Sequence, residues 1–458
     1  MALFDYVWAR QQGGRFMVRI EDTDRSRFNP QSEQRILQSL RWLGLQYDEG
    51  PDIGGPNAPY HQSQRLELYH RYADQLLELG CAYRAFETPE ELERIRRELD
   101  GKGQRRGYDG RGRALPQEES DRRARAGEPF AVRLRAPDSG ITVVRDQLRG
   151  PVRFDNAGLE DTILLKSDGY PTYHLAVVID DHLAGVSDVL RGEEWLSSAA
   201  IHVLLYGALD WEQPNWYHLP LLRNPDHSKL SKRSGHTSLE WFRGQGVLPE
   251  ALCNYLALMG FSMPDGRELF SLEQLIEAFS WRRFSLSGPV FDLQKLLWLN
   301  GKYIREVLEV TELERRLAGF GAERGWQPYP TFARVVELMR PRISTLLEFW
   351  ERTRYFYAED YPVTEAAAAL VADSGPLLEE ALAALRQLRP FSAEAAEAAL
   401  RDLAQRQGRK LGQLVQPLRA ALCGATETPG MFEILELLGP ELTERRLERA
   451  VAGTHGLV

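Results

Sequence analysis

The chain has 458 residues and a net charge of −9 at pH 7, and 43% of its residues are hydrophobic. This length exceeds what one hydrophobic core accommodates, so we expect a globular protein of two to four domains. The chain has no apolar run of about 18 residues, which argues against a membrane-spanning helix. Its acidic balance does not favour a generic nucleic-acid binder, although a local basic face can still bind phosphates.

The first eighty residues alternate between helix and strand patterns. A helix is predicted over Leu3–Gln11, a strand over Arg15–Ile20, and two further helices over Pro30–Leu43 and Leu66–Leu79. The acidic pair Glu21-Asp22 stands at the C-terminal end of the strand. This alternation predicts a parallel, doubly wound sheet.

The composition changes between Ala82 and Leu165. The segment Gly101–Arg113 is rich in Gly and Arg and is either a phosphate-contacting arm or a solvated loop. Short strands are predicted after it, at Phe130–Arg135, Ile141–Arg145 and Val152–Asn156. These features predict an inserted α+β unit.

The parallel pattern resumes with a strand predicted at Leu175–Ile179, a helix at Ser197–Leu209 and a strand at Trp216–Leu222. Asp181 and Arg191 follow the first of these strands, on the side where ligands bind in open α/β sheets. The sequence therefore predicts a ligand site near these two charges.

The segment Lys229–Arg233 reads Lys-Leu-Ser-Lys-Arg, after the last of these strands and before an amphipathic helix predicted at Leu239–Met259. Three cations and a hydroxyl within five residues suit a polyphosphate whose charge moves during a reaction. A solvated basic loop is the alternative, and the flanking strand and helix favour the phosphate site. After Tyr303 the chain is rich in Ala, Leu, Glu and Arg, and apolar residues such as Leu378, Leu382 and Leu385 recur at helical spacing, which predicts helical bundles.

Five further segments accompany this loop. They are VRIEDTDRSR from Val18, YHQSQR from Tyr60, LLKSDGYPTYHLA from Leu164, DDHLAGVSDVLRGEEW from Asp180 and FDLQKLLWLNGKYI from Phe291. Together with the Lys-Leu-Ser-Lys-Arg loop, and in the same order, they resemble the bacterial-type glutamyl-tRNA synthetases, which are class I aminoacyl-tRNA synthetases. The similarity extends from the first residue to the last helix.

The resemblance implies an α/β, Rossmann-like catalytic domain with an α+β insertion, followed by all-α anticodon-binding domains. The catalytic domain is expected in two halves, at residues 1–80 and 171–225, around an acceptor-binding insertion at residues 81–170. A stem-contact region carrying the Lys-Leu-Ser-Lys-Arg loop is expected at residues 226–305, and a helical anticodon-binding region at residues 306–458.

The resemblance also implies a glutamate–tRNA ligase. Such an enzyme activates L-glutamate with ATP and Mg²⁺ to glutamyl-adenylate and transfers it to the 3′ end of tRNA(Glu). We expect a cytoplasmic monomer without membrane contacts. Some members hold zinc in the acceptor-binding insertion, but Cys81 alone cannot supply such a site and the three cysteines lie far apart, so no zinc is expected.

Site residues follow from the matched motifs. Lys232 and Lys229 are the expected catalytic contacts to the phosphates, and Leu230, Ser231 and Arg233 complete the ATP-binding loop. Glutamate is expected to contact Glu21, Tyr173, Arg191 and Trp195. Anticodon readers are expected at Arg342, Arg419, Thr428 and Met431.

Two departures from the family pattern stand out. Close relatives often carry Asn four residues after the matched Tyr, where this chain has Val177. Family members also begin with a strand carrying an Arg and a Ser-Pro-Thr-Gly segment and with a His-x-Gly-His or His-x-Gly-Thr loop that contacts ATP, whereas this sequence starts at the helix that follows. The predicted catalytic domain is therefore incomplete at its N-terminus.

Two hypotheses explain this start. One is a truncated or misplaced start of an active ligase, which we favour because the ATP loop, Arg191 and the anticodon residues all match. The other is a degenerate relative that binds tRNA without aminoacylating it. Under either hypothesis we expect the 458 residues alone to be a poor enzyme and less stable than an extended form.

Other enzyme classes fit less well. The enzyme that glutamylates a modified base of tRNA(Asp) lacks an anticodon-binding region, and glutaminyl-tRNA synthetase builds that region from β-barrels. A P-loop kinase would need a G-x-x-x-x-G-K-[ST] motif, which is absent. Whether tRNA(Gln) is also charged stays open, although Arg342 favours strict charging of tRNA(Glu).

Overall fold

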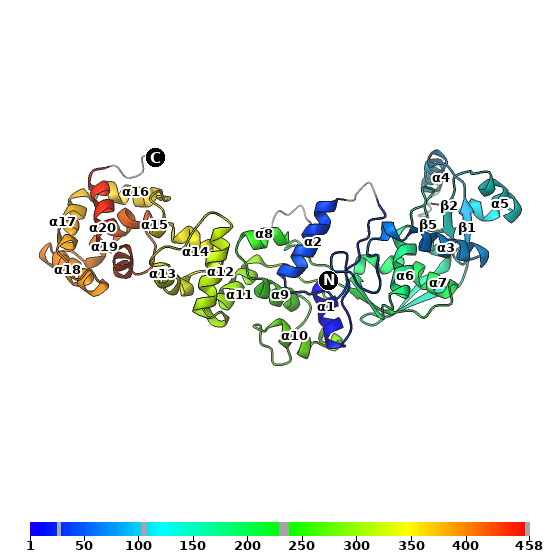
Figure 1. The fold of residues 1–458 in the computed structure, drawn as a ribbon, viewed down its shortest axis with the longest axis horizontal. Helices are drawn as coiled ribbons and strands as arrows, with labels where there is room; N and C mark the ends of the chain where they lie inside the picture. The colour runs from blue at the N-terminus through cyan, green and yellow to red at the C-terminus, as the bar shows by residue number, and fades with distance from the viewer. Residues whose placement is uncertain (25–28, 102–107, 229–237, 454–458) are drawn as a thin grey trace. The chain divides into compact units, whose positions relative to one another are not determined.

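The computed structural model describes residues 1–24, 29–101, 108–228 and 238–453. The chain divides into two compact units, one comprising Met1–Thr237 and Leu252–Asp292 and the other Ser238–Ala251 and Leu293–Val458. All the named strands precede Pro220, and the C-terminal part is helical (Figure 1). Within the described ranges, no helix is both long enough and apolar enough to cross a membrane.

A four-stranded mixed sheet organises the first unit. Its strands lie in the order β4 (Gly150–Asp155), β3 (Ile141–Asp146), β7 (Asn215–Leu219), β6 (Asp188–Gly192). The hairpin β3–β4 is antiparallel, whereas β7 runs parallel to both β3 and β6. The register of β6 against β7 pairs Arg191 with His218, so their side chains project from the same face of the sheet.

Three helices supply much of the core beside this sheet: α3 (Leu66–Glu78), α6 (Tyr173–Leu183) and α7 (Ala199–Ala208). Helices α6 and α7 pack against each other (Figure 1). The strand predicted at Leu175–Ile179 was wrong, because these residues form the middle of α6 and are buried on every side. A short, continuously apolar run has no periodicity that separates a buried strand from a buried helix.

The N-terminal helices are confirmed as α1 (Ala2–Gln11), α2 (Pro30–Trp42) and α3. The strand predicted at Arg15–Ile20 is reduced to two isolated parallel bridges, from Met17 to Glu49 and from Ile20 to His61. The partner segment between these two bridges contains three prolines, which cannot donate ladder hydrogen bonds, so the pairing does not extend into a strand.

A second sheet confirms the α+β character of the insertion. Its three antiparallel strands lie in the order β1 (Ala82–Ala85), β2 (Ala131–Leu134), β5 (Ile163–Leu165), with the helices α4 (Pro89–Gly101) and α5 (Gln117–Arg125) between β1 and β2 in the chain. The predicted strands all form, as β2, β3 and β4. However, β3 joins β7 in the first sheet rather than the strands of the second.

The second unit confirms the predicted helical bundles. The helix predicted at Leu239–Met259 forms as α8 (Leu239–Gly244) and α9 (Pro249–Leu258), and most of α9 belongs to the first unit. From Leu293 onward, the helices of the second unit follow one another with short connections. They are α11 (Leu293–Lys302), η7 (Tyr303–Val307), α12 (Val310–Ala322), α13 (Phe332–Met339), η8 (Arg340–Arg342), α14 (Leu346–Arg352), α15 (Arg354–Tyr357), α16 (Glu365–Ala372), α17 (Gly375–Arg386), α18 (Ala393–Arg406), α19 (Leu411–Cys423) and α20 (Met431–Val451). The break between α8 and α9 falls at Gly246, whose φ of 73° is left-handed.

Candidate active site

Arg191 lies near the C-terminal end of β6 and is only 7% exposed. Its Nε donates to His218 Nε2 at 3.0 Å, and its Nη1 donates to His202 Nδ1 at 3.0 Å and to the Tyr173 hydroxyl at 3.4 Å. The guanidinium carbon lies 5.1 Å from the centroid of the Trp216 ring. Among the described residues, none accepts a hydrogen bond from Nη2, although this nitrogen is buried.

The two imidazoles beside Arg191 are neutral. Arginine only donates hydrogen bonds, so each ring must offer it a lone pair. His218 then donates from Nδ1 to Asp146 at 2.7 Å, and His202 donates from Nε2 to His174 Nδ1 at 3.0 Å. Burial and the Arg191 charge lower the pKa of His202 well below its usual value and that of His174 to about 4. The two imidazoles that accept from the guanidinium are therefore uncharged.

Two aromatic side chains stand beside this guanidinium. Tyr173 begins α6, and its ring centroid lies 4.4 Å from that of Trp195 on η4 (Glu193–Ser198). Trp195 is 38% exposed, so it borders the site on the solvent side. Val177 is buried one turn further along α6 and is 7% exposed, so it contributes apolar surface where relatives often carry an amide.

Two carboxylates, those of Asp181 and Glu21, lie close to these residues. Arg19 Nη1 donates to Asp181 Oδ1 at 2.8 Å, and Arg19 Nη2 lies 3.5 Å from Glu21 Oε1. Burial raises the pKa of Asp181, while Arg19 opposes this shift. Burial also raises the pKa of the Tyr173 hydroxyl, which Arg191 lowers and Glu21 raises, so both charges act on this hydroxyl. The structure thus brings Glu21, Tyr173, Arg191 and Trp195 into one neighbourhood.

Asp180 holds the acidic side of the site in place. Its carboxylate is 2% exposed and accepts hydrogen bonds from Arg65 Nε at 2.7 Å, the Tyr69 hydroxyl at 2.8 Å and Gln62 Nε2 at 2.9 Å. Arg19 Nε lies 3.6 Å from the same carboxylate. These bonds connect α3 to α6, and they fix the backbone that carries Asp181.

The predicted ATP-binding loop lies outside the described residues. This applies to all five of its members, namely Lys229, Leu230, Ser231, Lys232 and Arg233. The strand expected before the loop is confirmed as β7. The helix after it begins with an N-cap in which the Ser238 hydroxyl accepts from Trp241 N.

The predicted anticodon residues lie on two parts of the second unit. Arg419 on α19 donates from Nη1 to the Thr426 carbonyl at 3.5 Å, and Thr428 follows in the same connection to α20. Met431 begins α20 and is 2% exposed, so its side chain packs into the bundle. Arg342, at the end of η8, is exposed and donates from Nη1 to the Leu338 carbonyl at 2.8 Å.

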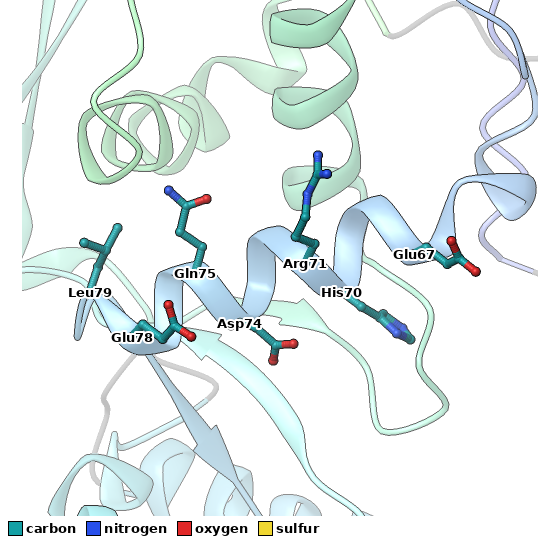
Figure 2. Close-up of a pocket in the computed structure, with 7 residues that line it drawn as sticks. All are labelled: Glu67, His70, Arg71, Asp74, Gln75, Glu78 and Leu79. Atoms are coloured by element: carbon teal, nitrogen blue, oxygen red, sulfur yellow. The ribbon is translucent and has the colours of Figure 1, made fainter.

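An open concavity of about 860 Å³ runs along α3 (Figure 2). Its seven lining residues come from this helix and the residue that follows it, and they include none of the predicted site residues: Glu67, His70, Arg71, Asp74, Gln75, Glu78 and Leu79. Three of them are carboxylates, which repel a triphosphate. The Arg191 neighbourhood is therefore the better candidate for the active site.

Comparison with known proteins identifies the family of the chain. A family model for the catalytic domain of class I tRNA synthetases (E and Q) matches residues 1–298, and an anticodon-binding-domain model matches residues 306–451. The glutamate–tRNA ligase of Thermus thermophilus is 60% identical over 99% of this chain and 96% of its own. The chain belongs to the class I glutamate–tRNA ligases.

Further members of the family support this placement. The glutamate–tRNA ligase of Deinococcus radiodurans is 46% identical over 98% of this chain and 94% of its own length. A crystal structure of a glutamate tRNA ligase from Elizabethkingia meningosepticum, in complex with its amino acid, has a TM-score of 0.86 at 34% identity and covers 98% of this chain and 95% of that one. The family and fold class predicted from the motifs are confirmed, and these relatives give no support to a tRNA-binding protein without ligase activity.

Sequence reasoning missed several residues of the site. His202 and His218 are 1% and 0% exposed, and Asp146 is 3% exposed, yet each contributes to the setting of Arg191. The available signal was a histidine inside an apolar run, in Ile-His-Val-Leu-Leu and in Trp-Tyr-His-Leu. Such a histidine indicates a buried imidazole, but not the side chain that it contacts.

Proposed function

We propose that this chain activates L-glutamate with MgATP and transfers the glutamyl group to the 3′ end of tRNA(Glu). The observation that carries this proposal is the buried Arg191 guanidinium, which has an unpartnered Nη2 and only neutral hydrogen-bond partners among the described residues. A buried charge without a hydrogen-bonded counter-charge is costly, and a carboxylate is the partner that guanidinium geometry fits best. The side-chain carboxylate of glutamate supplies that partner.

The acidic side of the site suits the other end of the substrate. Glu21 and Asp181 present carboxylate oxygens for the substrate ammonium group, while Tyr173 and Trp195 pack against its carbon chain. Tyr173 keeps its hydroxyl proton because burial raises its pKa, so it also serves as a donor. Opposite charges at two ends of one neighbourhood favour an acidic amino acid over an apolar one.

The reaction then needs positioning rather than a protein nucleophile. The substrate α-carboxylate oxygen attacks the α-phosphorus of ATP, and pyrophosphate leaves with the electron pair of the broken P–O bond. The hydroxyl of the 3′-terminal ribose next attacks the adenylate carbonyl, and AMP leaves. In this proposal Lys229 and Lys232 neutralise the phosphates, Ser231 donates to them, and Leu230 and Arg233 complete the loop.

The second unit is proposed to read the anticodon. Arg342 and Arg419 can each donate two hydrogen bonds to a base edge, and Thr428 stands near Arg419. Met431, whose side chain is buried at the start of α20, would support that site from within the bundle. The partners of the chain are thus tRNA(Glu) and L-glutamate, for a monomer in the cytoplasm. All three cysteines are free, two of them buried, which supports a reducing compartment.

Replacing Arg191 tests the proposal. We expect Arg191→Gln to lower kcat/KM for glutamate by about tenfold to a hundredfold, because charged hydrogen bonds to the substrate are lost. The measurement is glutamate-dependent exchange of pyrophosphate into ATP, with tRNA(Glu) present. Arg71→Gln, on the exposed face of α3, removes the same charge and serves as the control. Equal exchange by R191Q and R71Q would refute the assignment.

A further inference from the structure

A hydrogen-bonded chain of side chains stands behind Arg191. It begins at Asp146, which is 3% exposed and accepts from the backbone N–H groups of Leu148, Arg149 and His218 at 2.8 to 3.0 Å. Its Oδ2 also accepts from His218 Nδ1 at 2.7 Å. Burial opposes ionisation, but these bonds hold the pKa of Asp146 below its ordinary value. Asp146 is therefore a fixed anion that sets the tautomer of His218.

The chain continues on the other side of the guanidinium. His202 is 1% exposed, accepts a hydrogen bond from Arg191 Nη1, and donates one from Nε2 to His174 Nδ1. The planar fork of Arg191 is thus held at Nε and at Nη1 by two buried rings. The one nitrogen that these rings leave without a partner is Nη2. A side chain with many rotamers is in this way fixed before any ligand arrives.

We propose that His202 and His218 are positioning residues that also set the specificity of the site for an acidic amino acid. As neutral acceptors they orient the guanidinium without cancelling its charge, so a substrate carboxylate is preferred over the amide of glutamine. A protein carboxylate in either place would orient Arg191 equally well but would neutralise it. This inference rests on the proposed function, because it takes Arg191 to be the contact to the substrate side chain.

The nearby charged groups are paired elsewhere. Glu193 Oε2 accepts from Arg149 Nη2 at 2.7 Å, and Asp181 accepts from Arg19 at 2.8 Å. Asp146 reaches Arg191 only through the His218 ring. The neutral His218 ring thus lies between the Arg191 guanidinium and the Asp146 carboxylate. The guanidinium is held in place by a hydrogen bond to the ring, and no carboxylate in the described part of the chain contacts it directly to neutralise its charge.

A matched pair of variants at His202 tests the inference. The side-chain oxygen of His202→Asn can take the place of Nδ1 as a neutral acceptor, and His202→Asp has the same shape with a negative charge. Dissociation constants for L-glutamate and L-glutamine are measured by titration calorimetry on the full chain. We expect H202N to keep glutamate preferred, and H202D to lose about tenfold or more of that preference relative to H202N. Equal preferences in the two variants would overturn the inference.

Thermal unfolding shows whether H202D folds. If it does not, a second pair of variants, at His218, tests the positioning role. His218→Gln places an acceptor near the Nε2 position that Arg191 uses, whereas His218→Asn keeps only the donor toward Asp146. We expect H218N to weaken glutamate binding more than H218Q does, and the reverse order would contradict the positioning role. If the unmodified chain binds glutamate but the variants behave alike, the inference fails and the proposed function stands. If it binds neither amino acid, both fail.

Discussion

The side chains around Arg191 hold its guanidinium in one orientation by hydrogen bonds. The motif around it indicated a carboxylate-binding arginine, and Tyr173 and Trp195 came from the same resemblance. The histidines that orient it could not be predicted, because they come from other elements, α7 and β7. They meet Arg191 only through helix packing and the sheet register. A sequence motif names the residue that contacts the substrate more readily than the residues that hold it.

The buried histidines make stability depend on pH. In the unfolded chain a histidine takes up a proton near its ordinary pKa of 6.5, whereas burial and Arg191 lower the pKa of folded His174 to about 4 and that of His202 in the same direction. The unfolded state therefore binds more protons between these values. We expect the free energy of unfolding to fall as the pH drops from about 6.5 toward 4, by at most about 1.4 kcal/mol per pH unit for each group.

Urea unfolding at several pH values measures this dependence. His174→Gln removes one of the two groups, so its unfolding free energy should fall less steeply over the same pH range than that of the unmodified chain. Above about pH 7 both states carry neutral imidazoles, and these groups contribute no slope there. An unchanged slope in H174Q would show that His174 takes up its proton over the same pH range in the folded and unfolded states, and would contradict the lowered pKa.

At the scale of elements, most helices and strands whose apolar residues recur with a clear period were predicted correctly. The helices α1, α2, α3 and α7 and the strand β7 form within a few residues of the expected bounds. The errors share a cause, which is that tertiary context decided the outcome. The run Leu175–Ile179 is apolar on every side and forms a helix, and Arg15–Ile20 alternates like a strand but meets a proline-rich partner.

The break between α8 and α9 was also missed, and it yields a prediction. Gly246 has a φ of 73°, and a Cβ there would lie 2.6 Å from Leu347 N. We expect Gly246→Ala to lower the free energy of unfolding by about 2 kcal/mol, because both the backbone conformation and the close approach exclude a side chain.

Gly244→Ala is the matched control for this element. Nothing lies within 4 Å of a Cβ added at Gly244, which ends α8 without a left-handed φ. Alanine there should be neutral or stabilise the protein by about 0.5 kcal/mol. Chemical unfolding of both variants provides the comparison, and a similar loss in the two would remove the special role given to Gly246.

At the scale of the whole molecule, the two compact units follow the two family models, one for catalysis and one for the anticodon, except that Ser238–Ala251 belongs to the second unit but lies within the catalytic model. The five segments expected from the sequence, and the four boundaries between them, stay predictions. The Lys-Leu-Ser-Lys-Arg loop carries the two lysines predicted to contact the phosphates, and it lies in a range that the structure does not describe. The evidence for function in the structure comes instead from the Arg191 neighbourhood.

Substitutions in the two units should change different kinetic constants. We expect Arg342→Gln to raise KM for tRNA(Glu) by about tenfold, the value of a two-bond contact to a base, while KM for glutamate stays the same. Arg401→Gln, on the exposed face of α18, is the control for charge loss in the same unit. Aminoacylation assays with varied tRNA measure both, and an equal rise in the two variants would indicate only a general electrostatic effect.

The central claim is that Arg191 takes the side-chain carboxylate of glutamate while Glu21 and Asp181 face its ammonium group. A crystal structure of the chain with bound L-glutamate tests this most directly. We predict a carboxylate oxygen within hydrogen-bond distance of Arg191 Nη2, with the Tyr173 hydroxyl beside it and the ammonium nitrogen toward Glu21. Glutamate bound away from Arg191, or with its α-carboxylate rather than its side chain on that guanidinium, would contradict the account.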